Sequence, residues 1–308
     1  MEDKKIYDVI VIGGGPAGYT GAMYTARAGF CTLVIEGNSV GGQMTQTEKI
    51  DNYPGFPEGI DGIKLGMEMQ AGAERFGVET VYGRVTKATL ADKIKTVETE
   101  DATYLGKTVI IATGADHKHL GIEKEAELTG RGVSYCATCD GMFFRGKTVV
   151  VVGGGNSAVA DALVLSRIAK EVILVHRRDT LRATKIYHDA LQKAPNVSFR
   201  WNSRVKTLHS ETLLTGITIE DVHTGEESYI PCQGMFVGIG RQPATALFAN
   251  EVELDSQGYI VADETTKTNL PGVYAAGDVR TKASRQIVTA AADGATAAYF
   301  IEGYLAEE

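Results

Sequence analysis

Short runs of apolar, largely β-branched residues recur along the chain, separated by stretches that favour helices. Residues 6–12 (IYDVIVI) form the first run, residues 22–28 favour a helix, and residues 32–35 form a second run that ends at Glu36. Runs of this composition are typical of buried parallel strands. A strand, a helix and a second strand in this order make a βαβ unit, which predicts an α/β fold.

A glycine-rich loop connects the first strand to the helix of this unit. It follows the pattern Gly-x-Gly-x-x-Gly, with Gly13, Gly15, Pro16, Ala17 and Gly18 as its candidate binding residues. The first glycine allows a tight turn, the second lets the backbone approach a pyrophosphate, and the third lets the helix pack closely on the strand. Glu36 ends the second strand, where an acid can accept hydrogen bonds from ribose hydroxyls. One such loop alone could also be an ordinary glycine turn.

The same landmarks recur later in the chain with the same spacing. Strands are expected at 148–152 and 171–175, with a helical stretch up to Ala169 between them. His176 stands where the first copy has Glu36. A repeat this regular predicts two dinucleotide-binding units. The candidate binding residues of the second loop are Gly153, Gly155, Asn156, Ser157 and Ala158.

The two units differ after their second strands, where dinucleotides are distinguished. The first has the single acid Glu36, whereas the second has His176-Arg177-Arg178 followed by Arg182. An acid repels a 2′-phosphate, and arginines bind one bidentately. We therefore expect FAD or NAD in the first unit and NADPH in the second. A solvated basic face is the alternative reading of the arginines, but it carries less weight in a chain of net charge −8.

Further segments favour a flavin in the first unit. A strand at 108–112 leads into Thr113-Gly114, and a strand-like segment from residue 272 runs into Gly277-Asp278. Asp278 could bind a polyol such as the ribityl chain, or cap the next helix. Residues 284–300 look like a helix whose N-terminus could stabilise charge on a reduced flavin. With the glycine-rich loop 41–56, these segments supply the candidates Gly42, Gln43, Asn52, Thr113, Gly114, Gly277, Asp278, Arg285, Gln286 and Ile287.

Cys136 and Cys139 are separated by two residues, which is the spacing of a redox pair or of half a zinc site. The other two cysteines, Cys31 and Cys232, are isolated, and no His-x-x-x-His pair occurs. A redox pair is therefore the favoured interpretation, and we expect no metal. If Cys136 begins a helical turn, the free backbone N–H groups favour its thiolate.

Composition narrows the class of protein. The chain has 308 residues, 44% of them hydrophobic and 23% charged, which suits two ordinary globular domains. The acidic balance argues against nucleic acid as a partner, and no apolar run reaches the roughly 18 residues of a membrane span. With four cysteines and no export signal, we expect a reducing, cytoplasmic setting.

The order of the motifs predicts one domain inserted into another. Residues 1–115 and 243–308 would form the flavin domain, and residues 116–242 would form the NADPH domain that carries the cysteine pair. Glycine-rich joints at 113–117 and 238–243 mark the two crossings. Two crossings at one place predict a two-stranded hinge.

Together these motifs resemble the low-molecular-weight thioredoxin reductases, and the likeness extends over the whole chain. It is carried by the two glycine loops, by Cys136-Ala-Thr-Cys139-Asp140-Gly141, by His176-Arg-Arg-Asp-x-x-Arg182-Ala183 and by Gly277-Asp278. The resemblance implies a homodimeric flavoenzyme with two three-layer, Rossmann-like domains that binds FAD and NADPH and reduces thioredoxin. It also implies that Cys139 faces the flavin, that Cys136 attacks the partner's disulfide and that Asp140 supplies a proton. A helix cap is the alternative role for Asp140.

Two positions depart from the family pattern, and other activities stay open. Ala160 stands where the family usually has a glutamate near the nicotinamide, and Leu181 replaces a phenylalanine. The alternatives are a relative fed by another donor such as ferredoxin, an oxygen-dependent dithiol oxidase, and a flavin-binding protein whose cysteines serve only as a sensor or clip. The three arginines favour NADPH over another donor. Because one flavin must serve both the nicotinamide and the cysteines, the NADPH domain is expected to rotate about its hinge.

Overall fold

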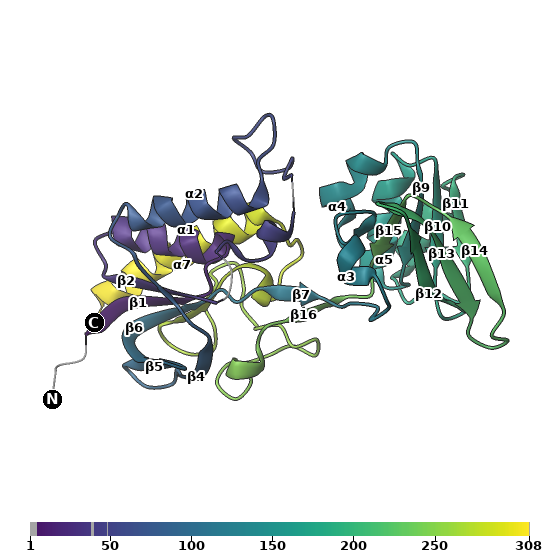
Figure 1. The fold of residues 1–308 in the computed structure, drawn as a ribbon. Helices are drawn as coiled ribbons and strands as arrows, with labels where there is room; N and C mark the ends of the chain where they lie inside the picture. The colour runs from purple at the N-terminus through teal and green to yellow at the C-terminus, as the bar shows by residue number, and fades with distance from the viewer. Residues whose placement is uncertain (1–4, 38–39, 48, 308) are drawn as a thin grey trace. The chain divides into compact units, whose positions relative to one another are not determined.

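Two units share the chain in the computed structural model, which describes residues 5–37, 40–47 and 49–307. Unit 1 comprises Met1–Asp116 and Gln242–Glu308, and unit 2 comprises His117–Arg241. The strands β7 (Ala115–His117) and β16 (Arg241–Pro243) pair with each other where the chain crosses between the units (Figure 1). Beside them Gly114 and Gly240 adopt φ angles of 73° and 109°, which glycine reaches without strain.

Unit 1 is built on a seven-stranded sheet. Five strands run parallel in the order β3-β2-β1-β6-β17, and an antiparallel pair, β5 and β4, continues from the first half of β6. The strand bounds are β1 (Ile6–Ile12), β2 (Thr32–Glu36), β3 (Glu79–Tyr82), β4 (Val85–Thr89), β5 (Lys95–Thr99), β6 (Thr103–Ile111) and β17 (Val273–Ala275).

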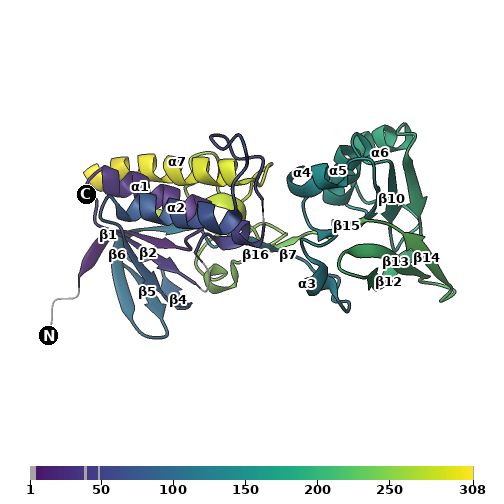
Figure 2. The ribbon, with the colours of Figure 1, turned by 45° about the horizontal axis from the view of Figure 1, so that its top comes forward.

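Helices α1 (Pro16–Arg27), α2 (Gly62–Glu74) and α7 (Ile287–Ala306) cover one face of this sheet (Figures 1 and 2). Val9 and Val11 of β1 pack in the cluster on the helix side, whereas Ile10 and Ile12 pack in the cluster on the opposite side. Both faces of β1 are therefore buried from Val9 to Ile12, which explains the apolar sequence of this part of the strand.

Helix α1 begins earlier than its sequence pattern indicated. The expected helix started at residue 22, but α1 starts at Pro16, directly after Gly15. Proline is favoured in the first turn of a helix because its φ angle suits the helix and its missing N–H would have no partner there. The last helix is also shifted, since α7 ends at Ala306 rather than near residue 300.

Unit 2 contains a five-stranded, fully parallel sheet in the order β11-β10-β9-β15-β8 and an antiparallel sheet in the order β12-β13-β14. The larger sheet packs on α5 through one cluster and on the antiparallel sheet through another. The strand bounds are β8 (Val133–Ser134), β9 (Thr148–Val152), β10 (Glu171–Val175), β11 (Val197–Arg200), β12 (Ser203–Ser210), β13 (Leu214–Asp221), β14 (Glu227–Pro231) and β15 (Gly234–Val237).

The helices of unit 2 are α3 (Glu125–Leu128), α4 (Ala137–Asp140), α5 (Asn156–Ser166) and α6 (Lys185–Gln192). The short 3₁₀ turns are η1 (Gly42–Gln46), η2 (Gly141–Phe144), η3 (Ala246–Phe248) and η4 (Gly277–Val279). In each unit a helix directly follows the glycine loop at the end of a strand: α1 follows β1, and α5 follows β9. The predicted α/β class with two Rossmann-like sheets is confirmed.

Candidate active site

Cys136 and Cys139 form a disulfide in unit 2. Cys136 is the N-cap of α4, and its Sγ accepts a hydrogen bond from the backbone N–H of Cys139 at 3.2 Å. Both residues are half-buried, so the disulfide retains access from solvent. Among the described residues there is no group of three or more His, Cys, Asp or Glu side chains that could hold a metal.

The carboxyl group of Asp140 lies beside this disulfide. Its Oδ2 accepts a hydrogen bond from Ser134 Oγ at 2.6 Å, and the same hydroxyl accepts the backbone N–H of Cys136 at 3.1 Å. Burial raises the pKa of Asp140, and the Ser134 hydroxyl only partly opposes this. The side chain forms no helix cap, so the capping alternative is wrong.

A second carboxyl group, which the sequence analysis did not predict, contacts the turn that carries Cys136 and Cys139, here called the redox turn. Asp161 on α5 accepts the backbone N–H of Ala137 at Oδ1, at 3.3 Å. Burial raises the pKa of Asp161 to about 6, against the opposing effects of the Ala137 N–H and Arg241. The contact joins residues far apart in sequence, and no local pattern signals it.

The first glycine loop has two glycines that the fold requires and one that it does not. Gly13 has a φ of 104°, and a Cβ there would lie 2.6 Å from Ala112 O. A Cβ on Gly18 would lie 1.8 Å from Gly13 O. At Gly15 an added Cβ would meet only Gly41 O, at 4.0 Å. The space beside Gly15 is therefore open to a ligand, as the pyrophosphate prediction requires.

Glu36 lies at the end of β2, against this loop. It is 5% exposed, its Oε1 accepts the backbone N–H of Gly37 at 2.8 Å, and its Oε2 has no hydrogen-bond partner among the described residues. Burial raises the pKa of its carboxyl group, and the nearby backbone N–H groups of Gly37, Gly41 and Gly14 only partly oppose this rise. A buried acceptor without a partner is costly, and a ribose hydroxyl would satisfy it.

The second loop repeats this geometry with different chemistry. A Cβ on Gly153 (φ 141°) would lie 2.5 Å from Gly238 O, and a Cβ on Gly155 would meet no atom within 4 Å. The methyl group of Ala158 fits in the place of Gly18 because it faces Gly238, which has no side chain. His176 replaces Glu36, with Nε2 lacking a partner among the described residues. Burial and the neighbouring Arg182, Arg178 and Arg177 lower its pKa, which favours the neutral ring.

The three arginines lie next to the second loop. The backbone N–H groups of Arg182 and Ala183 donate to Gly154 O at 2.7 and 3.1 Å, and Asn156 Oδ1 accepts the N–H of Thr184 at 2.9 Å. These bonds fold the segment that follows β10 over the loop, while Arg177, Arg178, Arg182 and the neighbouring Asn156 and Ser157 stay exposed.

The predicted flavin segments of unit 1 converge on the first loop. A Cβ on Gly277 would lie 2.9 Å from the methyl group of Ala17, and one on Gly42 would lie 3.4 Å from Gly15 Cα. Asn52 Nδ2 donates to Gln286 Oε1 at 3.0 Å, which ties the 41–56 loop to the N-cap of α7. Residue 48 of that loop lies outside the described residues.

The other candidates of this group lie nearby in the chain. Gln43 Nε2 donates to Ala115 O and to Asp116 Oδ1, and Thr113 Oγ1 donates to Ala244 O at 2.8 Å. Gly114 O accepts from Ala244 N at 3.0 Å, and the Arg285 guanidinium lies over the ring of Tyr259. The alternative of Asp278 as the cap of α7 is wrong, because that cap is Gln286 and the first residue of the helix is Ile287.

A family model described as Pyridine nucleotide-disulphide oxidoreductase matches residues 7–294. The thioredoxin reductase of Streptomyces clavuligerus is 48% identical over 306 residues, which cover 98% of this chain and 95% of that protein. The chain belongs to the pyridine nucleotide-disulphide oxidoreductase family. The crystal structure of thioredoxin reductase from Streptococcus pyogenes matches with a TM-score of 0.93 at 44% identity, covering 99% and 100% of the two chains. Lactococcus lactis thioredoxin reductase, in a structure titled FR conformation, matches at 0.68 and 42% identity, covering 98% and 100%.

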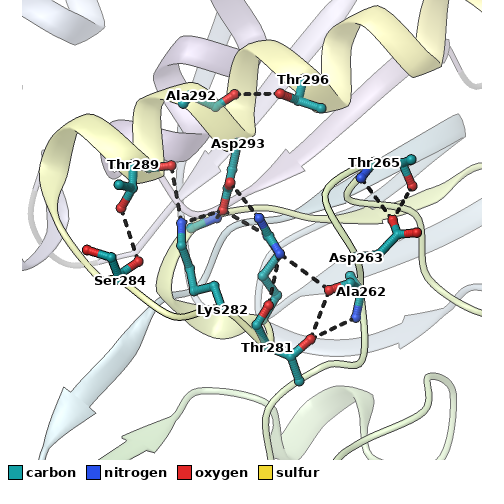
Figure 3. A network of polar contacts seen from close by, with 12 residues as sticks. Ala262, Asp263, Thr265, Thr281, Lys282, Ser284, Thr289, Ala292, Asp293 and Thr296 are labelled. Carbon is teal, nitrogen blue, oxygen red and sulfur yellow. Dashed lines mark hydrogen bonds and ion pairs between the residues drawn. The ribbon is translucent and has the colours of Figure 1, made fainter. Parts of the chain in front are cut away.

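This pyridine nucleotide-disulphide oxidoreductase also contains a buried ionic network that the sequence did not reveal (Figure 3). Asp293 of α7 accepts from Arg280 Nε and Nη2 at 2.9 and 2.7 Å, from Lys282 Nζ at 2.7 Å and from Gly277 N at 2.9 Å. The three charged side chains are only 7–9% exposed. Asp293 thus fixes the backbone of the Gly277-Asp278 segment against α7. The sequence signal for this network was an acid, Asp293, among the small residues in the first half of α7.

Proposed function

We propose that the chain is an NADPH-dependent thioredoxin-disulfide reductase, with FAD bound in unit 1 and NADPH in unit 2. The observation that carries this proposal is the half-buried Cys136–Cys139 disulfide in a chain with two unlike glycine loops, one beside a buried acid and one beside three arginines. The names of the relatives support thioredoxin as the partner. A homodimer in the cytoplasm is part of the same proposal.

The residues of unit 1 fit FAD. The open space at Gly15 suits a pyrophosphate, and the orphaned Oε2 of Glu36 suits a ribose hydroxyl. Asp278, Arg285, Gln286 and Ile287 would hold the remainder with the 41–56 loop, Thr113 and Gly114. Bound FAD supplies a two-electron carrier between the nicotinamide and the disulfide.

The residues of unit 2 fit NADPH rather than NADH. The pyrophosphate would bind at Gly155, Asn156 and Ser157, where α5 begins. Neutral His176 brings no negative charge to the ribose, and the exposed guanidinium groups of Arg177, Arg178 and Arg182 can bind a 2′-phosphate through charge-assisted hydrogen bonds.

The cysteine pair then exchanges disulfides with thioredoxin. The Cys136 thiolate attacks one sulfur of the thioredoxin disulfide and forms a mixed disulfide, releasing the other sulfur as a thiolate. The Cys139 thiolate attacks Cys136 Sγ, which re-forms the Cys136–Cys139 bond and frees thioredoxin as a dithiol. Asp140, whose pKa burial raises, would hold the proton for a departing thiolate. In sum, NADPH is oxidised, one proton is taken up, and one thioredoxin disulfide becomes two thiols.

Rotation of unit 2 about β7 and β16 is the conformational part of the proposal. The chain passes between the two units twice, at β7 and at β16.

Anaerobic mixing of the purified yellow holoenzyme with NADPH, and separately with NADH, tests the proposal. Rapid bleaching of the flavin absorbance by NADPH and slow or no bleaching by NADH is the expected result. Equal bleaching by NADPH and NADH would contradict the proposal that the three arginines recognise the 2′-phosphate. No bleaching by either would direct the search to another donor such as ferredoxin.

A further inference from the structure

Asp161 contacts the redox turn at the point where the turn begins. Its Oδ1 accepts the backbone N–H of Ala137, the first residue of α4, which lies between the two cysteines. At the same end of α4, Cys136 Sγ accepts the N–H of Cys139. The carboxylate therefore accepts one backbone N–H at the end of α4 where the sulfur accepts another.

This arrangement works against the Cys136 thiolate. Free N–H groups at the start of a helical turn lower a thiol's pKa, and a nearby anion raises it. Asp161 disfavours the Cys136 thiolate in two ways. It occupies one backbone N–H, and its carboxylate adds a negative charge nearby. A dithiol whose thiolate is disfavoured gives up its electrons more readily, since a stabilised reduced form makes a disulfide a stronger oxidant.

We propose that Asp161 is a positioning residue for the cysteine pair, whose charge opposes the Cys136 thiolate and makes the pair a stronger reductant at the expense of its rate of attack. The proposal deepens the disulfide-reductase function described above and rests on it. Asp140 is a separate carboxyl group, held by the Ser134 hydroxyl rather than by the backbone of α4.

The surroundings of Asp161 define the pH range of the effect. Burial raises its pKa to about 6, with Arg241 as the cation that opposes the rise. On the neighbouring hinge strand, burial, Arg241 and His119 lower the pKa of His117 to about 4, so that imidazole is neutral where Asp161 titrates. Asp161 therefore carries its charge above about pH 7 and loses it below about pH 5.

Other described elements packed beside α5 also carry ionisable side chains. Helix α4 contributes Asp140, as described above, and α6 contributes His188, whose Nε2 contacts Ala183 O at 2.9 Å. From the sheet, Glu171 of β10 contacts Thr148 Oγ1 at 3.4 Å. Within the part of the chain that the structure describes, Arg241 is the cation that acts on Asp161.

The rate at which iodoacetamide alkylates Cys136 in the reduced holoenzyme, followed against pH, tests the proposal. Asp161→Asn keeps an acceptor for Ala137 N–H and removes the charge, and Asp161→Glu keeps the charge. The control is Glu226→Gln, which removes an exposed charge from the β13–β14 turn. Alkylation needs neither NADPH nor thioredoxin, so its outcome is independent of whether thioredoxin is the partner.

We expect Asp161→Asn to react about tenfold faster than wild type above about pH 7, with the two rates converging below about pH 5. Asp161→Glu and Glu226→Gln should follow the wild-type profile. Superimposed profiles for wild type and Asp161→Asn would overturn the proposal. So would a rate ratio that is the same at every pH, because that result would mark a purely structural effect.

Discussion

Asp293→Ala is expected to destabilise unit 1 severely. The carboxylate accepts four hydrogen bonds, three of them from Arg280 and Lys282, whose side chains are 9% and 7% exposed. Removing one partner of a buried ion pair costs about 3–5 kcal/mol, because the remaining charge stays buried. Leaving the N–H of Gly277 without its acceptor adds about 1 kcal/mol. The expected loss is about 5 kcal/mol, or about 15 °C in Tm for a unit of this size.

Urea unfolding and thermal unfolding monitored by flavin fluorescence measure this loss. Asp293→Asn keeps one oxygen for Gly277 N and should lose about 3 kcal/mol. Glu302→Gln, on the exposed side of the same helix, is the matched control and should unfold like the wild type. A loss below about 1 kcal/mol for Asp293→Ala would refute the reasoning, since that is the range of an exposed pair.

The stabilisation should also depend on pH in a defined direction. Burial alone would raise the pKa of Asp293, but hydrogen bonds from Arg280 and Lys282 outweigh it and lower the pKa. A carboxyl group whose pKa is lower in the folded state stabilises the fold above its unfolded pKa, about 3.9, and this stabilisation is lost as the pH falls through the folded pKa. The difference between wild type and Asp293→Ala should therefore be full near neutral pH and shrink below about pH 4.

Three further predictions concern the reaction. Replacing Arg177 and Arg178 together by alanine should raise the KM for NADPH by roughly 10- to 100-fold and leave the KM for NADH nearly unchanged. This factor corresponds to the loss of one or two charge-assisted hydrogen bonds. Steady-state kinetics with both coenzymes measure it, and an equal rise in both KM values would mean that the arginines act only on folding. Cys139→Ser should abolish turnover and trap thioredoxin on Cys136 as a mixed disulfide that dithiothreitol releases, and a nonreducing gel without such a species would contradict the roles given to the two cysteines. Gly155→Ala should weaken NADPH binding without changing Tm, because no described atom lies within 4 Å of the added methyl group; a lowered Tm would show that the space belongs to the fold.

Local patterns were sufficient for the frame of the molecule. The largely apolar strands β1 and β9, the two glycine loops and the acid or histidine after them follow from short-range steric and burial rules, so they could be predicted. The start of α1 was predicted too late because the glycine loop leads into the helix at Pro16 without an intervening polar segment. The spacing of Cys136 and Cys139 predicted the redox pair that the structure joins.

Contacts between residues of different elements could not be predicted from the sequence. Asp293 pairs with Arg280 and Lys282 because α7 packs beside η4, and Asp161 reaches Ala137 because α5 packs beside α4. Neither contact has a local pattern, since each depends on how a helix lies against a loop from elsewhere in the chain. The same limit explains why Asp140 and Asp278 could not be separated from helix caps before the ends of the helices were known.

The most direct test of the central claim is an anaerobic stoichiometry. Holoenzyme, NADPH and oxidised thioredoxin are mixed, and NADPH oxidation and new thiols on thioredoxin are counted together. We predict that each NADPH consumed yields one reduced thioredoxin disulfide, and that Cys136→Ser or Cys139→Ser abolishes both signals. Oxidation of NADPH that continues without new thiols, or thioredoxin reduction that survives loss of either cysteine, would contradict the account.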